Sequence, residues 1–485
     1  MNYSMIRFTL GWLLIFEGIF LAVPLITSIV YWEPAFFAFL ITAALCVGVG
    51  FLLKYKRPKN TTIYAREGFI IVSLCWIFLS LFGALPFLFA GSTKSFIDAL
   101  FETVSGFTTT GATIFKEVES LPKSILMWRS FTHWVGGMGV LVFIMAFLPL
   151  GGGQNMHIMR AESPGPSVSK LVPRVKNTAI ILYIIYFVFT LILFIILLFA
   201  DMKPFDALNT AFSTAGTGGF GFRNDSFASA TATQQIIVTV FMLLFSINFN
   251  SYYLVLKLKF KDALNSEVRA FIFIVFAATM LIALNIYKDV GEFGEALRHA
   301  AFTVASLIST SGFSTLDFDL WPAFSKIILV LVMFVGACAG STGGGIKVSR
   351  IMLIFKCIGR ELRTLIHPNQ VKKITLDRRP VEHEVLRSVN AYIACYIMIF
   401  AVSMLAISFD GAFVGETHDL VTNFTAVVAT LNNIGPGLAE VGPNCNFGFF
   451  SAYSKLVLIF DMLAGRLELF PMLILFSPAA WKKNG

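Results

Sequence analysis

The chain has 485 residues, of which 57% are hydrophobic and only 13% are charged, and its mean hydropathy is +0.79. A soluble domain carries about 25% charged residues, so this composition excludes an ordinary soluble protein and indicates a protein that crosses a membrane many times. The net charge of +9 is better explained by basic loops on one side of a membrane than by a nucleic-acid partner, and the Cys spacing fits neither a zinc site nor a disulfide framework.

Hydrophobic runs of about 20 residues, the length that crosses ~30 Å of hydrocarbon, recur along the whole chain. The first run is too long for the core of a signal peptide and is kept as a span. The predicted spans cover residues 8–32, 34–54, 68–90, 124–148, 177–200, 233–256, 269–288, 322–355, 389–408 and 450–478.

The connections between these spans alternate in charge. Every second connection is rich in Lys and Arg, as is the C-terminal tail, and the positive-inside rule places these connections and both termini in the cytoplasm. The remaining connections are longer and lean acidic. Two interpretations of their acidic residues stay open: they concentrate cations at a pore mouth, or they are ordinary outer loops.

Each long outer connection contains a related segment of eight residues. The four segments are Val104–Gly111 (VSGFTTTG), Phe212–Gly219 (FSTAGTGG), Ala305–Gly312 (ASLISTSG) and Val428–Gly435 (VATLNNIG). The final Gly is the only position identical in all four, and the second position is always Ser or Ala. Four copies of a span, a short loop and a span in one chain predict a pseudo-fourfold pore.

A short apolar helical stretch leads into each of these segments, over residues 96–104, 205–212, 296–305 and 420–428. These stretches are too short to cross a membrane, so we expect half-helices that enter from outside and return through an extended loop. Irregular backbone at that depth is tolerated only when it is buried in protein or lines a water-filled path.

The predicted fold is therefore an all-α polytopic membrane protein. Four tandem parallel helix–pore-loop–helix repeats surround a central pseudo-fourfold pore, and a two-helix hairpin precedes them. The expected boundaries are 1–60 for the hairpin, 61–165 and 166–262 for repeats one and two, 263–380 for repeat three with an intramembrane loop and a basic cytoplasmic segment, and 381–485 for repeat four.

The chemistry of the four loops favours a monovalent cation. A half-helix that descends from outside aims the partial negative charge of its C-terminal end at the membrane centre. Extended backbone after it can offer carbonyl oxygens in place of water ligands, and Gly permits the backbone angles that this requires. The segments contain no carboxylate, which argues against a divalent-cation filter of charged side chains.

The four loops resemble those of the Trk/Ktr/HKT superfamily of potassium transporters, in the Thr-Thr-Thr-Gly, Thr-Gly-Gly-Phe, Thr-Ser-Gly-Phe and Asn-Asn-Ile-Gly sequences at their ends. The two leading spans and the length are similar to the bacterial TrkH-type branch. The resemblance implies potassium-selective uptake across the bacterial inner membrane, and Gly rather than Ser at position 111 is typical of potassium preference. It implies that potassium binds at Thr109, Thr110, Gly111, Thr217, Gly218, Gly219, Thr310, Ser311, Gly312, Asn433, Ile434 and Gly435.

The eighth span is anomalous because its apolar character extends from Trp321 to Cys357 and is interrupted by a glycine-rich run. This run is not a phosphate-binding loop, since Ile346 separates Lys347 from the last glycine. Its two interpretations are a mobile loop under the filter and a kink for close packing. In the family resembled, the corresponding loop obstructs the closed pore, which implies a gating role for Gly343, Gly344, Gly345 and Lys347.

The last span contains three ionisable residues, Asp461, Arg466 and Glu468. Charges inside a membrane usually face a partner or a wet cavity. Arg466 could form an ion pair with either carboxylate, or its guanidinium could repel cations below the filter. The resemblance implies the second role, because related proteins have an Arg in this helix that faces the pore.

The connection over residues 356–388 is strongly basic, which suits anionic lipid headgroups or an acidic partner. The resemblance implies a homodimer with a cytosolic, TrkA-like regulatory subunit that binds nucleotide and docks here. The chain has no nucleotide-binding fingerprint, so NAD or ATP would belong to that subunit and no intrinsic cofactor is expected.

Two other classes of protein are alternatives to a channel-like uptake protein. A secondary symporter coupled to H+ or Na+ would bind its ion between broken helices, but such proteins commonly contain inverted repeats, whereas these repeats are parallel. A membrane enzyme would need a convergent catalytic set, and the chain has no HExxH or GxSxG motif.

Overall fold

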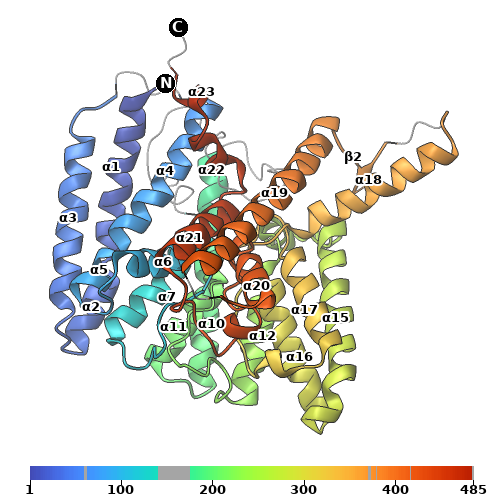
Figure 1. Ribbon diagram of the computed structural model, residues 1–485, viewed down its shortest axis with the longest axis horizontal. Coiled ribbons are helices and arrows are strands. Elements are labelled where there is room, and N and C mark those ends of the chain that lie inside the picture. The colour runs from blue at the N-terminus through green and yellow to red at the C-terminus, as the bar shows by residue number, and fades with distance from the viewer. Residues whose placement is uncertain (59–62, 140–174, 370–372, 378, 415–416, 483–485) are drawn as a thin grey trace.

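The chain is described by a computed structural model over residues 1–58, 63–139, 175–369, 373–377, 379–414 and 417–482. This part is helical apart from its loops and one two-stranded ribbon (Figure 1). Six of its helices are long and apolar enough to cross a membrane, or seven if one bent pair counts as a single span. The predicted all-α polytopic fold is confirmed.

The N-terminal hairpin consists of α1 (Tyr3–Phe20), α2 (Ala22–Val30) and α3 (Phe36–Lys54). The first two helices together form one candidate span, as the sequence predicts. The two arms cross closely at two glycines, because a Cβ atom at Gly11 would lie 2.7 Å from the carbonyl oxygen of Gly50. Small residues at such crossings let helix backbones approach within a membrane.

The next two units each contain an entering helix, a short buried helix, a loop and a returning helix. The first consists of α4 (Ala65–Gly83), α5 (Leu85–Phe89), α6 (Phe96–Phe107) and α7 (Lys123–Gly137). The second consists of α10 (Val175–Phe199), α11 (Pro204–Gly216), α12 (Ala232–Ser246), α13 (Phe249–Leu256) and α14 (Phe260–Ala263).

The last two units repeat the same order of elements. The third consists of α15 (Ser266–Val290), α16 (Phe293–Ile308), the 3-10 turn η1 (Phe318–Leu320), α17 (Ala323–Val335), α18 (Val348–Ile366) and the antiparallel strands β1 (Thr375–Leu376) and β2 (Arg379–Pro380). The fourth consists of α19 (His383–Val414), α20 (Leu420–Leu431), η2 (Ala439–Val441), α21 (Ala452–Arg466), α22 (Phe470–Leu475) and α23 (Pro478–Trp481).

The four predicted half-helices are present as α6, α11, α16 and α20, which have 12, 13, 16 and 12 residues. Side-chain caps fix where two of them begin. The Ser95 hydroxyl accepts a hydrogen bond from the Asp98 amide (3.3 Å), and the Asp419 carboxylate accepts one from the Thr422 amide (2.7 Å). All four are largely buried, and each ends inside one of the eight-residue segments, whose remaining residues form the loop.

Two spans that the sequence predicts as continuous are broken. The span over 233–256 bends by 92° between α12 and α13, where the Asn248 side chain accepts from the Asn250 amide and starts a new helix. The span over 450–478 is interrupted after α21, because Glu468 and Leu469 have φ of 61° and 64°. The first break contains no Gly or Pro, whereas the second lies between Gly465 and Pro471, and Pro471 stands in the first turn of α22.

Two other predicted spans differ in extent. In the span over 124–148, helix α7 ends at Gly137, and residues 140–148 lie outside the described residues. The span over 322–355 is interrupted as predicted, by residues 336–347 between α17 and α18. Helix α18 then runs on to Ile366 and projects from the helical body together with the β ribbon (Figure 1).

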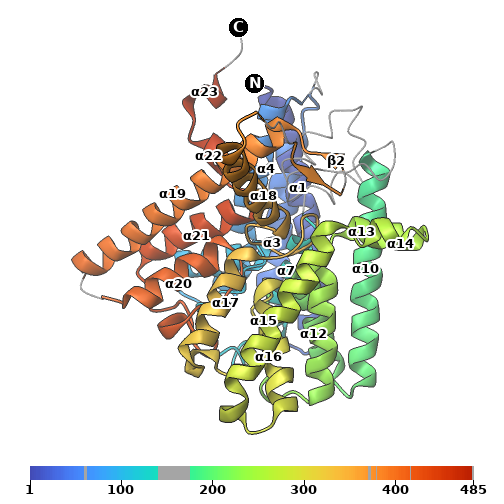
Figure 2. The same cartoon turned by 90° about the vertical axis from the view of Figure 1, so that its right-hand side faces the viewer.

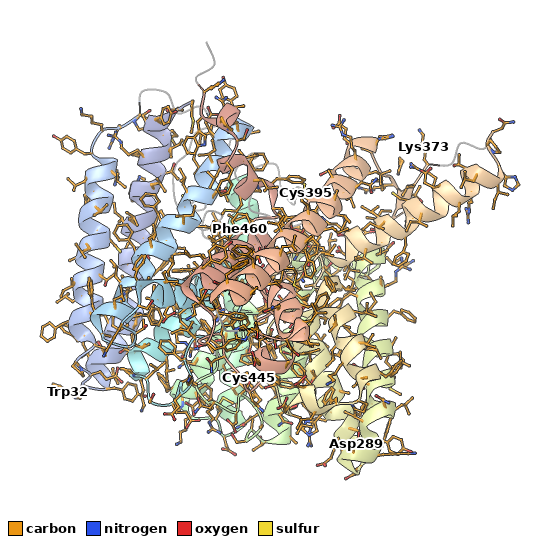
Figure 3. The ribbon with its side chains drawn as sticks, in the orientation of Figure 1. Trp32, Asp289, Lys373, Cys395, Cys445 and Phe460 are labelled. Carbon is orange, nitrogen blue, oxygen red and sulfur yellow. The ribbon has the colours of Figure 1, made fainter. Side chains whose placement is uncertain are left out.

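The two ends of the described chain lie together, since the Tyr3 hydroxyl donates to the Trp481 carbonyl (3.0 Å). Figure 3 places Lys373, in the basic connection, toward the same end of the molecule as α23. It places Trp32 and Asp289, which follow α2 and end α15, toward the opposite end. The basic connection that contains Lys373 and the acidic connection that contains Asp289 therefore lie toward opposite ends of the bundle.

Candidate ion pathway

The four predicted glycines meet in one ring, in which each packs on the backbone of the next unit. A Cβ atom at Gly111 would lie 1.9 Å from the Gly218 oxygen, at Gly219 1.7 Å from the Ser311 oxygen, at Gly312 2.2 Å from the Ile434 oxygen, and at Gly435 2.7 Å from the Thr110 oxygen. Each of these carbonyls belongs to the residue just before a ring glycine. We call these four glycines, with the residue before each, the glycine ring.

The backbone of the ring has the same conformation in all four units. The four glycines have φ between +78° and +94°, which favours glycine. The residue two positions before each glycine is also left-handed, with φ from 55° to 62°, at Thr109, Thr217, Thr310 and Asn433. The amide of the residue between these two donates to the carbonyl of the second residue of the segment at 2.8–2.9 Å. The four pairs are Thr110–Ser105, Gly218–Ser213, Ser311–Ser306 and Ile434–Ala429.

This geometry explains the small residue at the second position of each segment. Its carbonyl must accept, at close range, the amide of the residue just before the ring glycine. In two units its hydroxyl also donates to the extended segment that follows the ring glycine. Ser213 Oγ donates to the Phe220 carbonyl (2.9 Å) and Ser306 Oγ donates to the Phe313 carbonyl (2.6 Å).

The carbonyl oxygens of the loops are the candidate cation ligands. Within the described part of the chain, no hydrogen bond is donated to the carbonyl oxygen of any of the twelve residues predicted to bind potassium, although most of these residues are buried. Buried backbone carbonyls normally have a partner. Since the described residues also contain no cluster of three His, Cys, Asp or Glu suited to a metal, backbone oxygen is the donor that the ring offers.

Side chains of these residues have structural contacts instead. The Thr110 hydroxyl accepts from Asn433 Nδ2 (3.0 Å), which ties the first unit to the fourth. The Thr310 hydroxyl accepts from the Gly344 amide (2.7 Å). The imidazole of His133 lies directly behind the second loop, because a Cβ atom at Gly218 would lie 1.5 Å from His133 Nδ1.

The glycine-rich segment, Gly336–Lys347, lies against the ends of two half-helices. The Gly345 amide donates to the Asn432 carbonyl (3.1 Å) at the end of α20. A Cβ atom at Gly343 would lie 2.7 Å from the Ser309 carbonyl oxygen at the end of α16. Glycine is therefore needed here for close approach to the loops of units three and four.

Two charged side chains hold the glycine-rich segment in its fold. Lys347, which is 1% exposed, has φ of 81° and donates from Nζ to the Gly343 carbonyl. Glu267, at the start of α15, accepts from the amides of Ala339 (2.7 Å) and Ser349 (3.1 Å). The sequence singled out Lys347 but gave no reason to connect Glu267 with this segment.

Arg466 connects three units beneath the ring. Its guanidinium donates to the carbonyls of Thr342 (2.8 Å), Gly136 (2.5 Å) and Gly137 (2.6 Å), and it lies 3.4 Å from the Thr109 hydroxyl. Among the described residues, Arg466 forms no ion pair with either neighbouring carboxylate, Asp461 or Glu468.

The two neighbouring carboxylates have other partners. Glu468 pairs with Arg350 of the third unit, and Asp461 accepts from the Ser403 hydroxyl (2.7 Å). Arg350 also stacks over the Tyr392 ring at 3.9 Å. The break after α21 is thus anchored to α18, directly after the glycine-rich segment.

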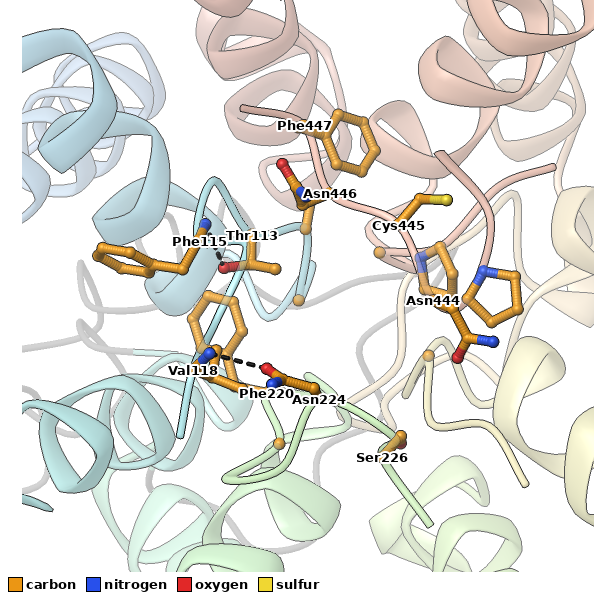
Figure 4. A pocket seen from close by; sticks show the side chains of 18 of the residues that line it. Thr113, Phe115, Val118, Phe220, Asn224, Ser226, Asn444, Cys445, Asn446 and Phe447 are labelled. Atoms are coloured by element: carbon orange, nitrogen blue, oxygen red, sulfur yellow. Dashed lines mark hydrogen bonds between the residues drawn. The ribbon is translucent and has the colours of Figure 1, made fainter. Parts of the chain in front are cut away.

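A cavity opens on the side of the ring where the chain leaves the four loops (Figure 4). It is lined by all four ring glycines and by residues of the extended segments that follow them. A hydrogen bond joins two of these segments, in which Asn224 Oδ1 accepts from the Val118 amide (2.8 Å). The charged residues that line it are Lys116, Arg129 and Arg223. The interpretation that acidic residues concentrate cations at the mouth does not hold for this cavity, because no carboxylate lines it among the described residues.

A buried ion pair beside this cavity was not found by sequence reasoning. Arg129 Nε donates to Glu102 Oε1 (2.7 Å), and the two side chains are 2% and 0% exposed. Glu102 also accepts from the Ile114 amide (2.9 Å), and Arg129 donates to the Gly221 carbonyl (3.1 Å). The Glu102–Arg129 pair therefore holds the outgoing strands of the first two ring segments.

The signal for this pair was present, as a carboxylate in a half-helix and a guanidinium in a predicted span. Charges at such depth usually have a partner. The partner could not be identified, because the two residues lie 27 positions apart on different elements.

The fold and the ring define a polytopic membrane protein whose four units surround one axis. Comparison with known proteins adds the family. Residues 35–483 match the family model TrkH, described as a cation transport protein. The chain belongs to the TrkH family.

Similar proteins extend over the whole chain. It is 37% identical to "Trk system potassium uptake protein TrkH" of Escherichia coli strain K12 and 35% identical to the protein of the same name from Halomonas elongata, with full coverage of both chains in each case. The crystal structure of the potassium transporter TrkH from Vibrio parahaemolyticus is similar with a TM-score of 0.89 and 34% identity, over 99% of this chain and 100% of that one. The resemblance drawn from the four loops is confirmed.

Removing one member of the Glu102–Arg129 pair is predicted to destabilise the ring. Glu102→Ala leaves a buried guanidinium without its carboxylate, which costs about 3–5 kcal/mol. We expect a clearly lower midpoint in thermal unfolding of the purified chain.

The matched control is Glu295→Ala, which breaks the exposed pair with Arg298 (3.4 Å) and should cost less than about 1 kcal/mol. The double variant Glu102→Leu with Arg129→Met should recover much of the lost stability, since no charge stays unpaired. Equal midpoints for Glu102→Ala and Glu295→Ala would contradict this role.

Proposed function

We propose that this chain is a potassium-selective uptake protein of the bacterial inner membrane. The observation that carries the proposal is the glycine ring, with its buried carbonyl oxygens that have no protein partner. Four half-helices end at the ring, so their partial negative charges favour a cation there. Uncharged oxygen ligands suit a monovalent ion, and "potassium uptake" in the names of full-length relatives supports potassium.

In this proposal the carbonyl oxygens around the ring replace water around the ion. Selectivity depends on how well the ring keeps its spacing or field strength. The glycine contacts between units, the Thr110–Asn433 hydrogen bond and the Glu102–Arg129 pair all oppose a change of spacing. The ion then meets the glycine-rich segment on the inner side.

We further propose that the glycine-rich segment and Arg466 form the gate. The segment contacts the ends of α16 and α20, and Arg466 hydrogen-bonds to it through the Thr342 carbonyl. A fixed positive charge under the ring repels a cation, and the hydrogen bonds keep the segment in the path. Opening requires Arg466 to release Thr342 and the two carbonyls at the end of α7.

Control of this gate is proposed to come from the cytosol. Exposed basic residues on α18 and the β ribbon, among them Arg363, Lys373 and Arg379, offer a docking surface for a TrkA-like, nucleotide-binding regulatory subunit on a homodimer of this chain. In this proposal NAD or ATP acts on that subunit, both termini lie in the cytoplasm, and potassium is the only ion bound by the chain itself.

Uptake of rubidium-86 into vesicles that contain the purified chain and an internal potassium load tests the function. We expect uptake that external potassium blocks and that external sodium or lithium does not, because a ring of uncharged carbonyl oxygens that selects potassium also accepts rubidium. Gly111→Ser should reduce this discrimination about tenfold or more, a change of roughly 1.4 kcal/mol, since its Cβ atom would meet the Gly218 oxygen.

Gly48→Ser is the control variant, because a Cβ atom at Gly48 would have nothing within 4 Å. It should leave competition by potassium and sodium as in the wild type. Sodium that competes as well as potassium against the wild-type chain would contradict the proposed function. Unchanged discrimination in Gly111→Ser would contradict the assignment of the ring as the filter.

Weakening the gate is predicted to raise uptake in the absence of any regulatory subunit. Arg466→Ala removes charge-assisted hydrogen bonds worth about 1.5–3 kcal/mol each, which corresponds to at least about tenfold in flux if one bond limits opening. Deletion of Gly343–Gly345 should also raise rubidium uptake. Both variants are compared by rubidium uptake with Arg363→Ala, an exposed Arg on α18.

Basal uptake by Arg363→Ala should equal that of the wild type. A gate made by other residues would leave uptake by Arg466→Ala and by the deletion at the wild-type level as well.

A further inference from the structure

A basic and apolar surface covers the turn between α12 and α15, outside the ion pathway. It consists of Leu256, Lys257, Leu258, Lys259, Phe260, Lys261 and Leu264, which we call the interfacial patch. The side chains of Leu256, Leu258, Phe260 and Leu264 are 71%, 77%, 56% and 53% exposed. The three lysines are exposed between them, with one acidic neighbour, Asp262.

The position of the patch matches the boundary between acyl chains and headgroups. Helix α12 has 15 residues and so rises about 22 Å, which is about 8 Å less than the ~30 Å of a bilayer core. Interfacial segments bury their apolar side chains about 5–10 Å into the membrane boundary, so this length places the bend at that depth. The bend of 92° then turns α13 into the plane of the membrane, and Figure 2 shows α13 and α14 pointing sideways out of the helical body. Segments that lie in this plane with leucine and aromatic side chains among lysines bind anionic membrane surfaces.

The same bend holds the glycine-rich segment on its inner side. A helix end leaves its last carbonyls without helical partners, and at the end of α12 the segment supplies donors for them. The Cys338 amide donates to the Ser246 carbonyl (3.0 Å), and the Thr342 hydroxyl donates to the Phe245 carbonyl (3.1 Å). Beyond the bend, the Phe249 amide donates to the Gly340 carbonyl (3.1 Å).

These bonds exist only while α13 stays turned away from α12. If α13 continued α12 as one straight helix, its amides would compete for the same carbonyls and displace the segment. Tyr252 adds to the bend by donating from its hydroxyl to the Leu244 carbonyl (2.5 Å). Whatever keeps α13 in the membrane plane therefore keeps the glycine-rich segment docked.

We propose that anionic phospholipid headgroups bind the interfacial patch through Lys257, Lys259 and Lys261 and thereby stabilise the closed position of the glycine-rich segment. Charge complementarity and the apolar side chains between the lysines select a lipid surface as the partner. The inference rests on the proposed function for the role of the segment as a gate, whereas lipid binding at the patch does not depend on it.

The test compares vesicles of phosphatidylcholine with vesicles that contain phosphatidylglycerol, using the full chain. Wild-type rubidium uptake should be about fivefold or more lower with phosphatidylglycerol, since each lysine near an anionic surface adds substantially to the attraction. The variant K257Q/K259Q/K261Q should lose this difference. The control K56Q/R57Q/K482Q removes three exposed basic residues near the two ends of the described chain, outside the patch and the proposed docking surface, and should keep it.

A second measurement is independent of ion flux. Photoactivatable phosphatidylglycerol should label the peptide that contains residues 256–264 more than photoactivatable phosphatidylcholine does, and the triple lysine variant should remove the excess. Equal labelling by the two lipids, or an unchanged lipid dependence of uptake in the triple lysine variant, would overturn the proposal. Excess labelling with no rubidium uptake in any variant, the Gly343–Gly345 deletion included, would instead contradict the proposed function and leave the lipid site standing.

Discussion

Irregular backbone at the centre of a membrane protein leaves carbonyl oxygens without partners, and the rest of this structure is arranged around that constraint. Each ring glycine lies so close to the neighbouring unit that a Cβ atom cannot fit, and the same left-handed turn recurs four times. Because each unit packs on the next in cyclic order, no loop can relax alone. Unpaired carbonyls in such a place are stable only with water or a cation as their partner.

The surroundings of the ring serve its two sides differently. On the side of the cavity, the Glu102–Arg129 pair fixes the segments that leave the first two loops, and the charged side chains that line the cavity are basic. In the proposed function, attraction for a cation therefore comes from the half-helix ends and the carbonyl groups at the ring itself. On the other side of the ring, the glycine-rich segment and Arg466 join units one, three and four, and the bend after α12 joins them to unit two. A change in any of these contacts affects the segment that lies in the proposed path.

Sequence patterns predicted the half-helices and the glycines that meet at the centre, because these features depend on local apolar length and on backbone angles that favour glycine. The bend between α12 and α13 was harder to predict. The Asn248 cap is local, but the donors that replace helical partners at the end of α12 come from the glycine-rich segment, which is distant in sequence. The partners of Arg466, Glu468 and Glu267 were missed for a related reason. Each is distant in sequence and is set by how the units pack.

We propose that the carbonyl oxygens just before the ring glycines bind the transported ion. X-ray diffraction at the rubidium absorption edge, from crystals of this chain soaked in rubidium salt, would locate that ion. We expect an anomalous peak on the axis of the ring, within ligand distance of these four oxygens, and its loss in crystals of Gly111→Ser. Rubidium ordered elsewhere in the wild-type chain, with no peak at the ring, would show that these oxygens do not bind the ion.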